Sequence, residues 1–356
     1  MRKTSSHWKS LQLIAEILSF EQNHHSLSES LKMAVNWEHI VKVASAHLLL
    51  PALLTRLEEK KLLDVVPKDL VAYLEEITRQ NRERNSTIQI EAKAISDIFK
   101  ANQLDFVFIK GVALLARGLF NENYERMIGD IDVLVKPDQC QQAFQLLSKN
   151  GYTERIEFNY VTKGFRHLPR QINPEKLTAV EIHSHVLDKK NEHFLSTSEL
   201  LERKQTVNGI DIPDDVDSIA LAIYANQLNN RAYYFNTLDL KITYDVLALL
   251  YVRGTNLNKQ VKDDKYIKKF FALSSELFPE LDDETTKRTK PFYRTLFILS
   301  NTYPQFGFLM FKVKSVVLAI YERLNLFLFN KSYRKHVITN KLQLIVILAD
   351  LFFVYN

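Results

Sequence analysis

Residues 129–135 read GDIDVLV, and this heptapeptide decides the fold expected for the chain. Successive side chains of a β-strand point to opposite faces, so Asp130 and Asp132 share one face and apolar residues occupy the other. Neighbouring carboxylates repel each other unless a cation neutralises them. Magnesium is the usual cation, because it prefers hard oxygen ligands. The stretch therefore predicts a strand with a candidate metal site, although a lone Asp-x-Asp pair is more often a solvated strand edge.

A second strand with acidic side chains is predicted at residues 180–186, which read VEIHSHV. Apolar and polar residues alternate there, as is typical of a half-buried strand. Glu181, His183 and His185 are all odd-numbered and would share one face. Glu181 either faces water or supplies a third carboxylate. Three acidic residues on two strands can hold two metal ions about 4 Å apart. Zinc bound by the histidines is a minority alternative.

The third feature is a turn from a strand into a helix. Residues 106–109, FVFI, predict a short buried strand, and residues 112–120 predict a helix. A helix N-terminus offers free N–H groups and a positive dipole end, so the intervening Lys110 and Gly111 could receive a phosphate. The alternative is a plain turn with a surface lysine. Arg126 has the same two interpretations, a phosphate contact or a surface arginine.

Glycine usage separates the chain into regions. Only eight glycines occur, and five of them lie between residues 111 and 164. Pro51 is expected to interrupt one N-terminal helix, and Pro67 to begin a long one. We therefore expect an α+β protein in four parts: a helical region at 1–102, an α/β core at 103–212, a helical region at 213–304, and a basic, aromatic tail at 305–356.

Several further elements are predicted around this core. They are a helix at 137–150, strands within 152–160 and 164–172, and a helix at 238–251. Tyr244 and Asp245 lie in the last of these, where they either line a nucleotide pocket or form a pair at the edge of the core. Cys140 is expected to be a packed thiol rather than a nucleophile. As the single cysteine, it also excludes an internal disulfide.

The charge of the chain is concentrated in its tail. The formal net charge is +5, and residues 305–356 hold seven Lys and Arg side chains against two acidic ones. The remaining residues are therefore formally neutral, which argues against a long nucleic-acid substrate. We expect the tail to be a helical cap on the core. An anionic partner or a membrane surface is the lesser alternative.

The sequence shows neither a secretory signal nor a membrane-spanning stretch. Charged residues interrupt the first apolar segment, so it lacks a clean hydrophobic region. The longest apolar run, at 342–355, has about 14 residues and is shorter than the ~20 that a spanning helix needs. A cytoplasmic location is the expectation.

Together the three motifs resemble the DNA polymerase β-like nucleotidyltransferase superfamily. More narrowly, the sequence resembles a bacterial, mostly uncharacterised nucleotidyltransferase family with a Leu-Lys-Gly turn, an Arg-x-x-Gly-Asp-Ile-Asp strand and a Glu-x-His strand. The matching stretches are FIKG at 108–111, RMIGDIDVLV at 126–135 and VEIH at 180–183. The likeness covers roughly residues 30–250.

The resemblance implies a mixed-sheet core whose Asp130, Asp132 and Glu181 ligate magnesium, as two ions, with manganese as an alternative. It implies phosphate contacts from Lys110, Gly111, Arg126 and Gly129. Supporting or substrate roles would fall to His183, His185, Tyr244 and Asp245. Two departures stand out. The turn lacks the Gly-Ser or Gly-Gly of well-studied superfamily members, and the third carboxylate is Glu rather than the frequent Asp.

The implied activity is transfer of an NMP from an NTP such as ATP to a hydroxyl acceptor, with release of pyrophosphate. The acceptor could be a small molecule, a protein or RNA, and the neutral core makes nucleic acid the less favoured choice. One alternative is a toxin-like enzyme that modifies tRNA or protein. Another is a non-catalytic nucleotide-binding or scaffold protein that retains the fold.

Overall fold

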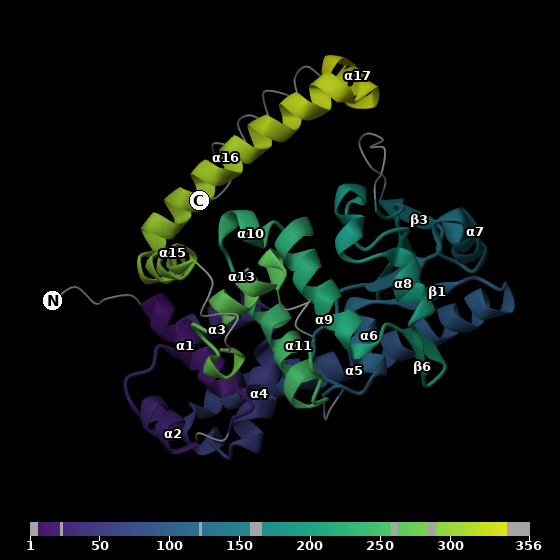
Figure 1. The fold of residues 1–356 in the computed structure, drawn as a ribbon. Helices are drawn as coiled ribbons and strands as arrows, with labels where there is room; N and C mark the ends of the chain where they lie inside the picture. The colour runs from purple at the N-terminus through teal and green to yellow at the C-terminus, as the bar shows by residue number, and fades with distance from the viewer. Residues whose placement is uncertain are drawn as a thin grey trace.

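The computed structural model describes residues 6–21, 24–120, 123–156, 166–257, 263–282 and 290–339. Within these ranges the chain is α+β, as predicted. A mixed sheet lies among helices from both ends of the chain, and one long helix runs along the top of the view (Figure 1).

The sheet has five strands in the order β1-β2-β5-β4-β3. Their bounds are β1 (Phe106–Phe108), β2 (Ile131–Val135), β3 (Glu154–Ile156), β4 (Arg170–Ile172) and β5 (Ala179–His183). Strands β2 and β5 are parallel, and the other pairs are antiparallel. The register places Asp132 beside Glu181, so the two acidic motifs meet in the middle of the sheet.

The two central strands are buried on both faces. Every residue of β2 is buried, and so is every residue of β5 after Ala179. The prediction of a half-buried strand at 180–186 was therefore wrong, and the strand ends at His183. The alternating pattern was misinterpreted because the polar groups of Glu181 and His183 form hydrogen bonds with other side chains rather than with water. The predicted strand segments around β3 and β4 are confirmed where described, and residues 157–165 lie outside the described ranges.

The N-terminal region is helical, as predicted. Its helices are α1 (Ser6–Leu18), α2 (His24–Lys32), α3 (Trp37–Ala46), α4 (Leu50–Glu59) and α5 (Lys68–Ala101), with a 3₁₀ turn at Leu63–Val65. Pro51 does not end a helix; it lies in the first turn of α4, where its missing N–H would have no partner. Pro67 caps the 34-residue α5.

The core region adds shorter elements around the sheet. They are α6 (Lys110–Ala116), a 3₁₀ turn (Pro137–Gln139), α7 (Cys140–Lys149), a second 3₁₀ segment (Lys189–Phe194), α8 (Thr197–Glu202), β6 (Gln205–Val207) and β7 (Ile210–Ile212). The β6–β7 hairpin was not predicted. Its turn residues Asn208 and Gly209 both have positive φ, as a tight hairpin turn requires.

The C-terminal part is again helical. It comprises α9 (Asp215–Tyr224), a π-helical turn (Ala225–Asn229), α10 (Ala232–Phe235), α11 (Leu240–Tyr251), α13 (Lys265–Ser274), a 3₁₀ turn (Pro279–Leu281), α15 (Pro291–Thr302), α16 (Pro304–Phe329) and α17 (Lys331–Thr339). The described residues contain no helix that combines the length and apolarity needed to cross a membrane.

Two apolar clusters form the interior. One joins helices from the N-terminal and C-terminal regions, and the other packs α5, α6 and α7 against the sheet. Helix α5 contributes to both, with Leu74 in the first and Phe99 in the second. In the second cluster Phe99, Phe106 and Phe108 meet edge to face. The long helix thus connects the helical body to the sheet.

The tail is helical where described, but it is not a buried cap. Helix α16 has no buried residue and stands away from the sheet (Figure 1). It contacts the rest of the protein mainly through α15 and α10. Its apolar side chains are consequently exposed, a point developed below.

Candidate active site

The three predicted carboxylates lie together at the centre of the sheet. Asp132 on β2 and Glu181 on β5 are buried, with 3% and 9% of their surface exposed. Asp130 lies directly before β2, two residues from Asp132, and is partly exposed. The alternation of side chains along a strand places all three on one face, as the sequence predicts.

Lys110 extends from the start of α6 onto this acidic face. Its Nζ lies 2.6 Å from Asp132 Oδ1, so the lysine is an ion-pair partner of the motif rather than a free surface cation. The backbone of Lys110 has φ +56°, in the left-handed region where a non-glycine residue is strained by about 1–2 kcal/mol. The turn therefore holds the amine against Asp132 at a cost in backbone energy.

His183 completes the polar cluster. Its Nε2–H donates to Asp132 Oδ1 at 2.7 Å and lies 3.4 Å from Glu181 Oε2, while its buried Nδ1 has no hydrogen-bond partner. One ligand atom each from Asp132, Glu181 and His183 lie within 4.8 Å of one another, as a metal ion requires. The sequence predicts Asp130 as a ligand beside Asp132 and Glu181; in the described structure His183 is the residue grouped with those two, and Asp130 lies two residues from Asp132.

Arg170 on β4 binds the carboxylates of Glu181 and Asp130. The sequence motifs did not identify this residue. Its Nε and NH2 donate to Glu181 Oε1 at 2.9 and 2.6 Å, and NH2 also donates to Asp130 Oδ2 at 3.1 Å. The antiparallel register of β4 and β5 brings Arg170 beside Glu181. A strand was predicted at 164–172, but its register against 180–186 cannot be read from one sequence.

These contacts raise the pKa of one of the three acids and lower the pKa of the other two. Burial, followed by repulsion from Asp132, raises the pKa of Asp130. For Asp132, burial also acts upward, but the Lys110 charge and the His183 hydrogen bond outweigh it and lower the pKa. For Glu181, hydrogen bonds from His183 and Arg170 outweigh burial and lower the pKa to about 2. Asp132 and Glu181 are therefore ionised at neutral pH.

A cavity of about 260 Å³ opens beside the acidic face. Its sheet side includes Lys110, Gly111, Arg126, Gly129, Asp130, Asp132 and His183. Its opposite side is formed by cavity-lining residues between 218 and 249, from α9, the π-helical turn and α11, and is called the helical wall below. Glu181, His185 and Tyr244 do not line this cavity. The site therefore lies between the sheet and the C-terminal helices.

Arg126 is neither a surface arginine nor a free phosphate contact. It is buried, and its Nε and NH2 donate to the two carboxylate oxygens of Asp245 at 2.6 and 2.8 Å. Asp245 belongs to α11, so the pair ties the loop before Asp130 to the helical wall. The two residues line the cavity, as the sequence suggested for Asp245, but their charges are engaged with each other.

Lys241 provides a cation on the helical wall that the sequence did not single out. It lies one turn before Asp245 on α11 and lines the cavity. Within the described part of the chain its amine makes no hydrogen bond or ion pair. Burial, then the nearby Arg126 charge, lowers its pKa. No local pattern marks such a lysine, because only the packing of α11 brings it to the sheet.

The described residues 123–130 form the loop that leads into β2 and are called the motif loop. One face of α5 supports this loop. Asn85, which is fully buried, donates its Nδ2–H to Arg126 O at 2.8 Å and also to Asn123 O. Arg84 donates from Nε to Ile128 O and from NH2 to Gly129 O, both at 3.1 Å. These backbone carbonyls immediately precede Asp130, so α5 sets the position of the motif.

The two predicted glycines have different surroundings. A Cβ at Gly111 would approach Ile128 Cγ1 to 3.1 Å, so this glycine permits close packing of α6 against the motif loop. A Cβ at Gly129 would meet nothing within 4 Å. Both residues line the cavity.

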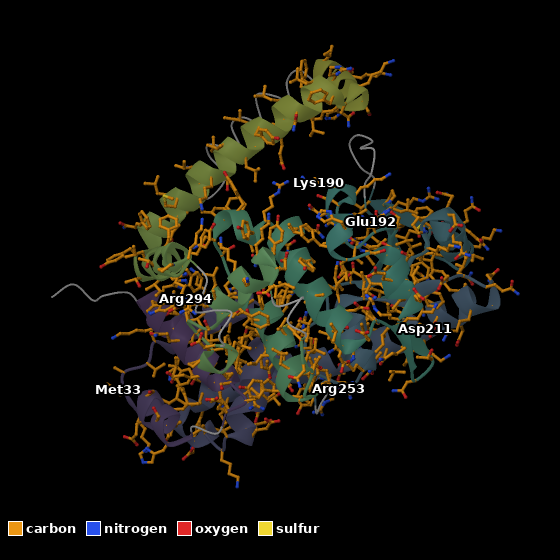
Figure 2. The ribbon with its side chains drawn as sticks, in the orientation of Figure 1. Met33, Lys190, Glu192, Asp211, Arg253 and Arg294 are labelled. Atoms are coloured by element: carbon orange, nitrogen blue, oxygen red, sulfur yellow. The ribbon has the colours of Figure 1, made fainter. Side chains whose placement is uncertain are left out.

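Two other predicted residues lie apart from the cluster. His185 follows the end of β5, and its Nε2 is 3.5 Å from Glu192, labelled in Figure 2. Tyr244 is a core residue whose ring stacks on Phe20 and Phe120 and whose hydroxyl donates to Glu125. The interpretation of Tyr244 as part of the packed core is therefore the one that its surroundings support.

Cys140 is buried, as expected, and its thiol lies 3.4 Å from Val135 O. Burial raises its pKa to about 12. The thiol is therefore neutral at physiological pH and poorly suited to act as a nucleophile.

Comparison with known families agrees with this architecture. Residues 33–260 match the model of a family of uncharacterised nucleotidyltransferases, a span from the N-terminal helices through α11 that contains the whole cluster. Because the match covers more than half of the chain, the protein belongs to this family. No curated protein matches the chain.

Proposed function

We propose that this protein is a divalent-metal-dependent nucleotidyltransferase that transfers an NMP from an NTP to a hydroxyl acceptor. The observation that carries the proposal is the juxtaposition of Asp132, Glu181 and His183 beside a cavity lined by lysines from both sides. Family membership supports nucleotidyl transfer in general. Metal dependence and the roles of individual residues are our inference from the site.

The donor set fits a divalent cation. Two ionised carboxylates and an imidazole converge there, and Asp130 stands two residues from Asp132 on the same face. Asp132 and Glu181 would hold magnesium, with Asp130 or His183 as a further ligand. A bound divalent ion supplies positive charge to phosphate oxygens and lowers the pKa of a bound hydroxyl.

The protein's own cations have separate tasks in this proposal. Lys110 and Lys241 line opposite sides of the cavity, so an NTP between them would have its negative charge met from both directions. Arg170 keeps Asp130 and Glu181 pointed at the same site. The Arg126–Asp245 pair fixes the motif loop against the helical wall and leaves Lys241 facing the cavity.

The test is transfer of label from NTPs to components of a cell extract in the presence of magnesium. We expect Asp132→Asn, which preserves size, to reduce transfer about 100-fold or more. Asp138→Asn is the matched control, because Asp138 is 69% exposed and lies outside the cavity. Absence of transfer, or equal transfer by the Asp132 variant, would contradict the proposal.

The same experiment separates the alternatives. Label on a small molecule would exclude the toxin-like class, whereas label on tRNA or on a protein would be compatible with it. Calorimetry with magnesium and each NTP tests the alternative of a non-catalytic nucleotide-binding or scaffold protein. Nucleotide binding that requires Asp132, without any transfer to the extract, would identify a non-catalytic binding protein.

A further inference from the structure

Helix α16 carries an apolar stripe along one side. Six residues form this outer stripe, spaced three or four apart: Leu309, Val313, Val317, Ile320, Leu324 and Leu328. Each exposes between 49% and 63% of its surface. At 1.5 Å per residue the stripe is about 28 Å long. A continuous exposed apolar surface of this length marks an interaction site rather than ordinary surface.

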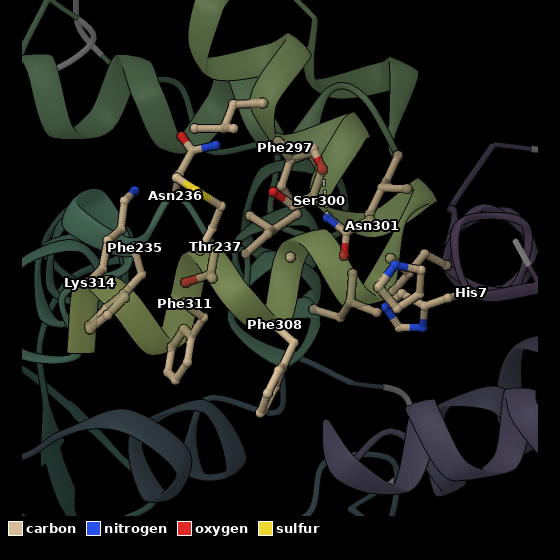
Figure 3. Close-up of a pocket in the computed structure, with 18 of the residues that line it drawn as sticks. His7, Phe235, Asn236, Thr237, Phe297, Ser300, Asn301, Phe308, Phe311 and Lys314 are labelled. Atoms are coloured by element: carbon tan, nitrogen blue, oxygen red, sulfur yellow. Dashed lines mark hydrogen bonds between the residues drawn. The ribbon is translucent and has the colours of Figure 1, made fainter. Parts of the chain in front are cut away.

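The contacts that α16 makes with the body of the protein determine which way the outer stripe points. Phe311 packs on Phe235 of α10 with ring centroids 4.7 Å apart, and Lys314 Nζ donates to Tyr234 O at 3.0 Å. Figure 3 shows Phe311, Lys314 and Phe235 around a second cavity, of about 250 Å³, between α16 and the body of the protein. These residues lie on a different face of α16 from the outer stripe. Rotating the stripe inward would break their contacts.

The charges around the stripe are almost all positive. Helices α16 and α17 contain six Lys and Arg side chains: Lys312, Lys314, Arg323, Lys331, Arg334 and Lys335. Their single acidic residue, Glu322, is paired with Arg231 of the body. Helical geometry places Lys312 and Arg323 along one side of the stripe and Lys314 along the other. One guanidinium nitrogen of Arg323 is buried, and Lys314 Nζ donates to Tyr234 O. An apolar surface bordered by cations is therefore presented to the outside.

We propose that α16 and α17 form a docking surface for an anionic lipid bilayer. The outer stripe would lie in the interfacial plane, and the long basic side chains would extend to the lipid phosphates. The positive charge of α16 and α17 favours an anionic bilayer over a second copy of the chain as the binding partner. Pairing two such helices would bring two sets of like charges together, whereas an anionic surface neutralises them. The inference does not depend on the proposed enzymatic activity.

The test is sedimentation of the full chain with vesicles of phosphatidylcholine, either alone or with phosphatidylglycerol added. We expect binding only to the anionic vesicles, and weakening by salt. The double variant Val317→Asp/Ile320→Asp should lower the bound fraction about tenfold or more, since it places charge in the interface. The control Ile90→Asp/Leu177→Asp adds the same charges at exposed apolar positions outside the tail and should bind normally.

Further measurements keep the outcome decisive. Circular dichroism must show equal helix content in both double variants, and Asp132→Asn must bind vesicles like the unmodified protein. Lys331→Gln/Lys335→Gln should reduce anionic binding without changing helix content. The proposal is overturned if the protein ignores anionic vesicles, or if the stripe variant still binds them. It is also overturned if light scattering shows a dimer that the stripe variant dissociates, because the stripe would then join two copies.

Discussion

At the scale of single residues, the candidate site is a set of buried acids, each matched to a cation. Asp132 receives Lys110 and His183, and Glu181 receives Arg170. Burying an unpaired carboxylate is costly, and these partners supply the hydrogen bonds that offset the lost hydration. Removing Arg170 would leave Glu181 without its cationic partner, whereas Asp132 would keep one partner if Lys110 or His183 were removed. The protein's own donors therefore offset the burial of these acids, and the ion of our proposal would share the carboxylate oxygens with them.

The left-handed backbone of Lys110 gives a prediction about stability. Lys110→Ala and Lys110→Gly both remove the amine, but only glycine adopts φ +56° without strain. We expect the Gly variant to be more stable than the Ala variant by about 1 kcal/mol in urea unfolding. Both variants should lose transfer activity to the same degree, because both lack the Lys110 amine that would contact the NTP. If the Ala variant were as stable as the Gly variant, Lys110 would not hold this conformation.

Glu125 gives a prediction about pH. Burial raises its pKa from 4.5 to about 7, although the Tyr244 hydrogen bond opposes this. The folded state therefore keeps a proton that the unfolded state releases. The resulting stability is fully present below pH 4.5 and is lost as the pH rises through 7, by about 3 kcal/mol. Glu125→Gln cannot ionise, so its unfolding free energy should fall less than that of the unmodified protein between pH 5 and pH 8. Parallel pH profiles would refute the assignment.

At the scale of secondary structure, α5 acts as the support for the motif loop. Asn81, Arg84 and Asn85 occupy neighbouring positions on one helix face and donate to carbonyls between residues 124 and 129. Further along the same helix, Glu91 accepts hydrogen bonds from Tyr152 and Thr178, next to β3 and β5. Buried polar residues on one face of α5 thus position the catalytic candidates.

Asn85→Ala tests this support. The substitution removes the donor to the partly buried Asn123 carbonyl and leaves the buried Arg126 carbonyl with the longer bond from Asn81, which costs about 1–3 kcal/mol of unfolding free energy. We expect a further fall in transfer activity at temperatures where the variant is still folded, because the loop before Asp130 is released. Thr87→Ala is the control, since Thr87 is partly exposed and its hydroxyl donates to Glu83 O within α5. A variant that lost stability but kept full activity would limit Asn85 to a folding role.

The elements show which parts of this arrangement a sequence can predict. The strands at 106–108 and 131–135 and the helix after Pro67 were found, because their signals are local runs of apolar residues and a proline. Arg170 and Lys241 were not found, because strand register and the packing of α11 bring them to the site. The half-buried interpretation of 180–186 failed for the same reason: its polar residues are covered by β2 and β4. The β6–β7 hairpin had a local signal, Asn208-Gly209, that was not used.

At the scale of the whole molecule, the candidate site lies where two bodies meet. The lining draws on both apolar clusters, because Ala113 and Ile128 belong to the cluster around the sheet, whereas Leu114 belongs with the helical wall to the other. The Arg126–Asp245 pair and α5 join the two bodies around the cavity. A ligand that contacts both sides should therefore stabilise the molecule as a unit rather than one region alone.

Nucleotide binding should consequently raise the thermal unfolding midpoint. At about 100 times its dissociation constant, a ligand stabilises the folded state by about 2.7 kcal/mol, enough to raise the midpoint by several degrees. We expect this rise with magnesium and the preferred NTP, measured by scanning calorimetry with each NTP in turn. Asp132→Asn on the sheet and Lys241→Met on the helical wall should each abolish most of it, because each removes one side of the site. Lys149→Met, an exposed lysine on α7, should leave it unchanged. If Lys241→Met kept the full rise while Asp132→Asn lost it, the nucleotide would contact the sheet alone and the helical wall would be free to bind the acceptor.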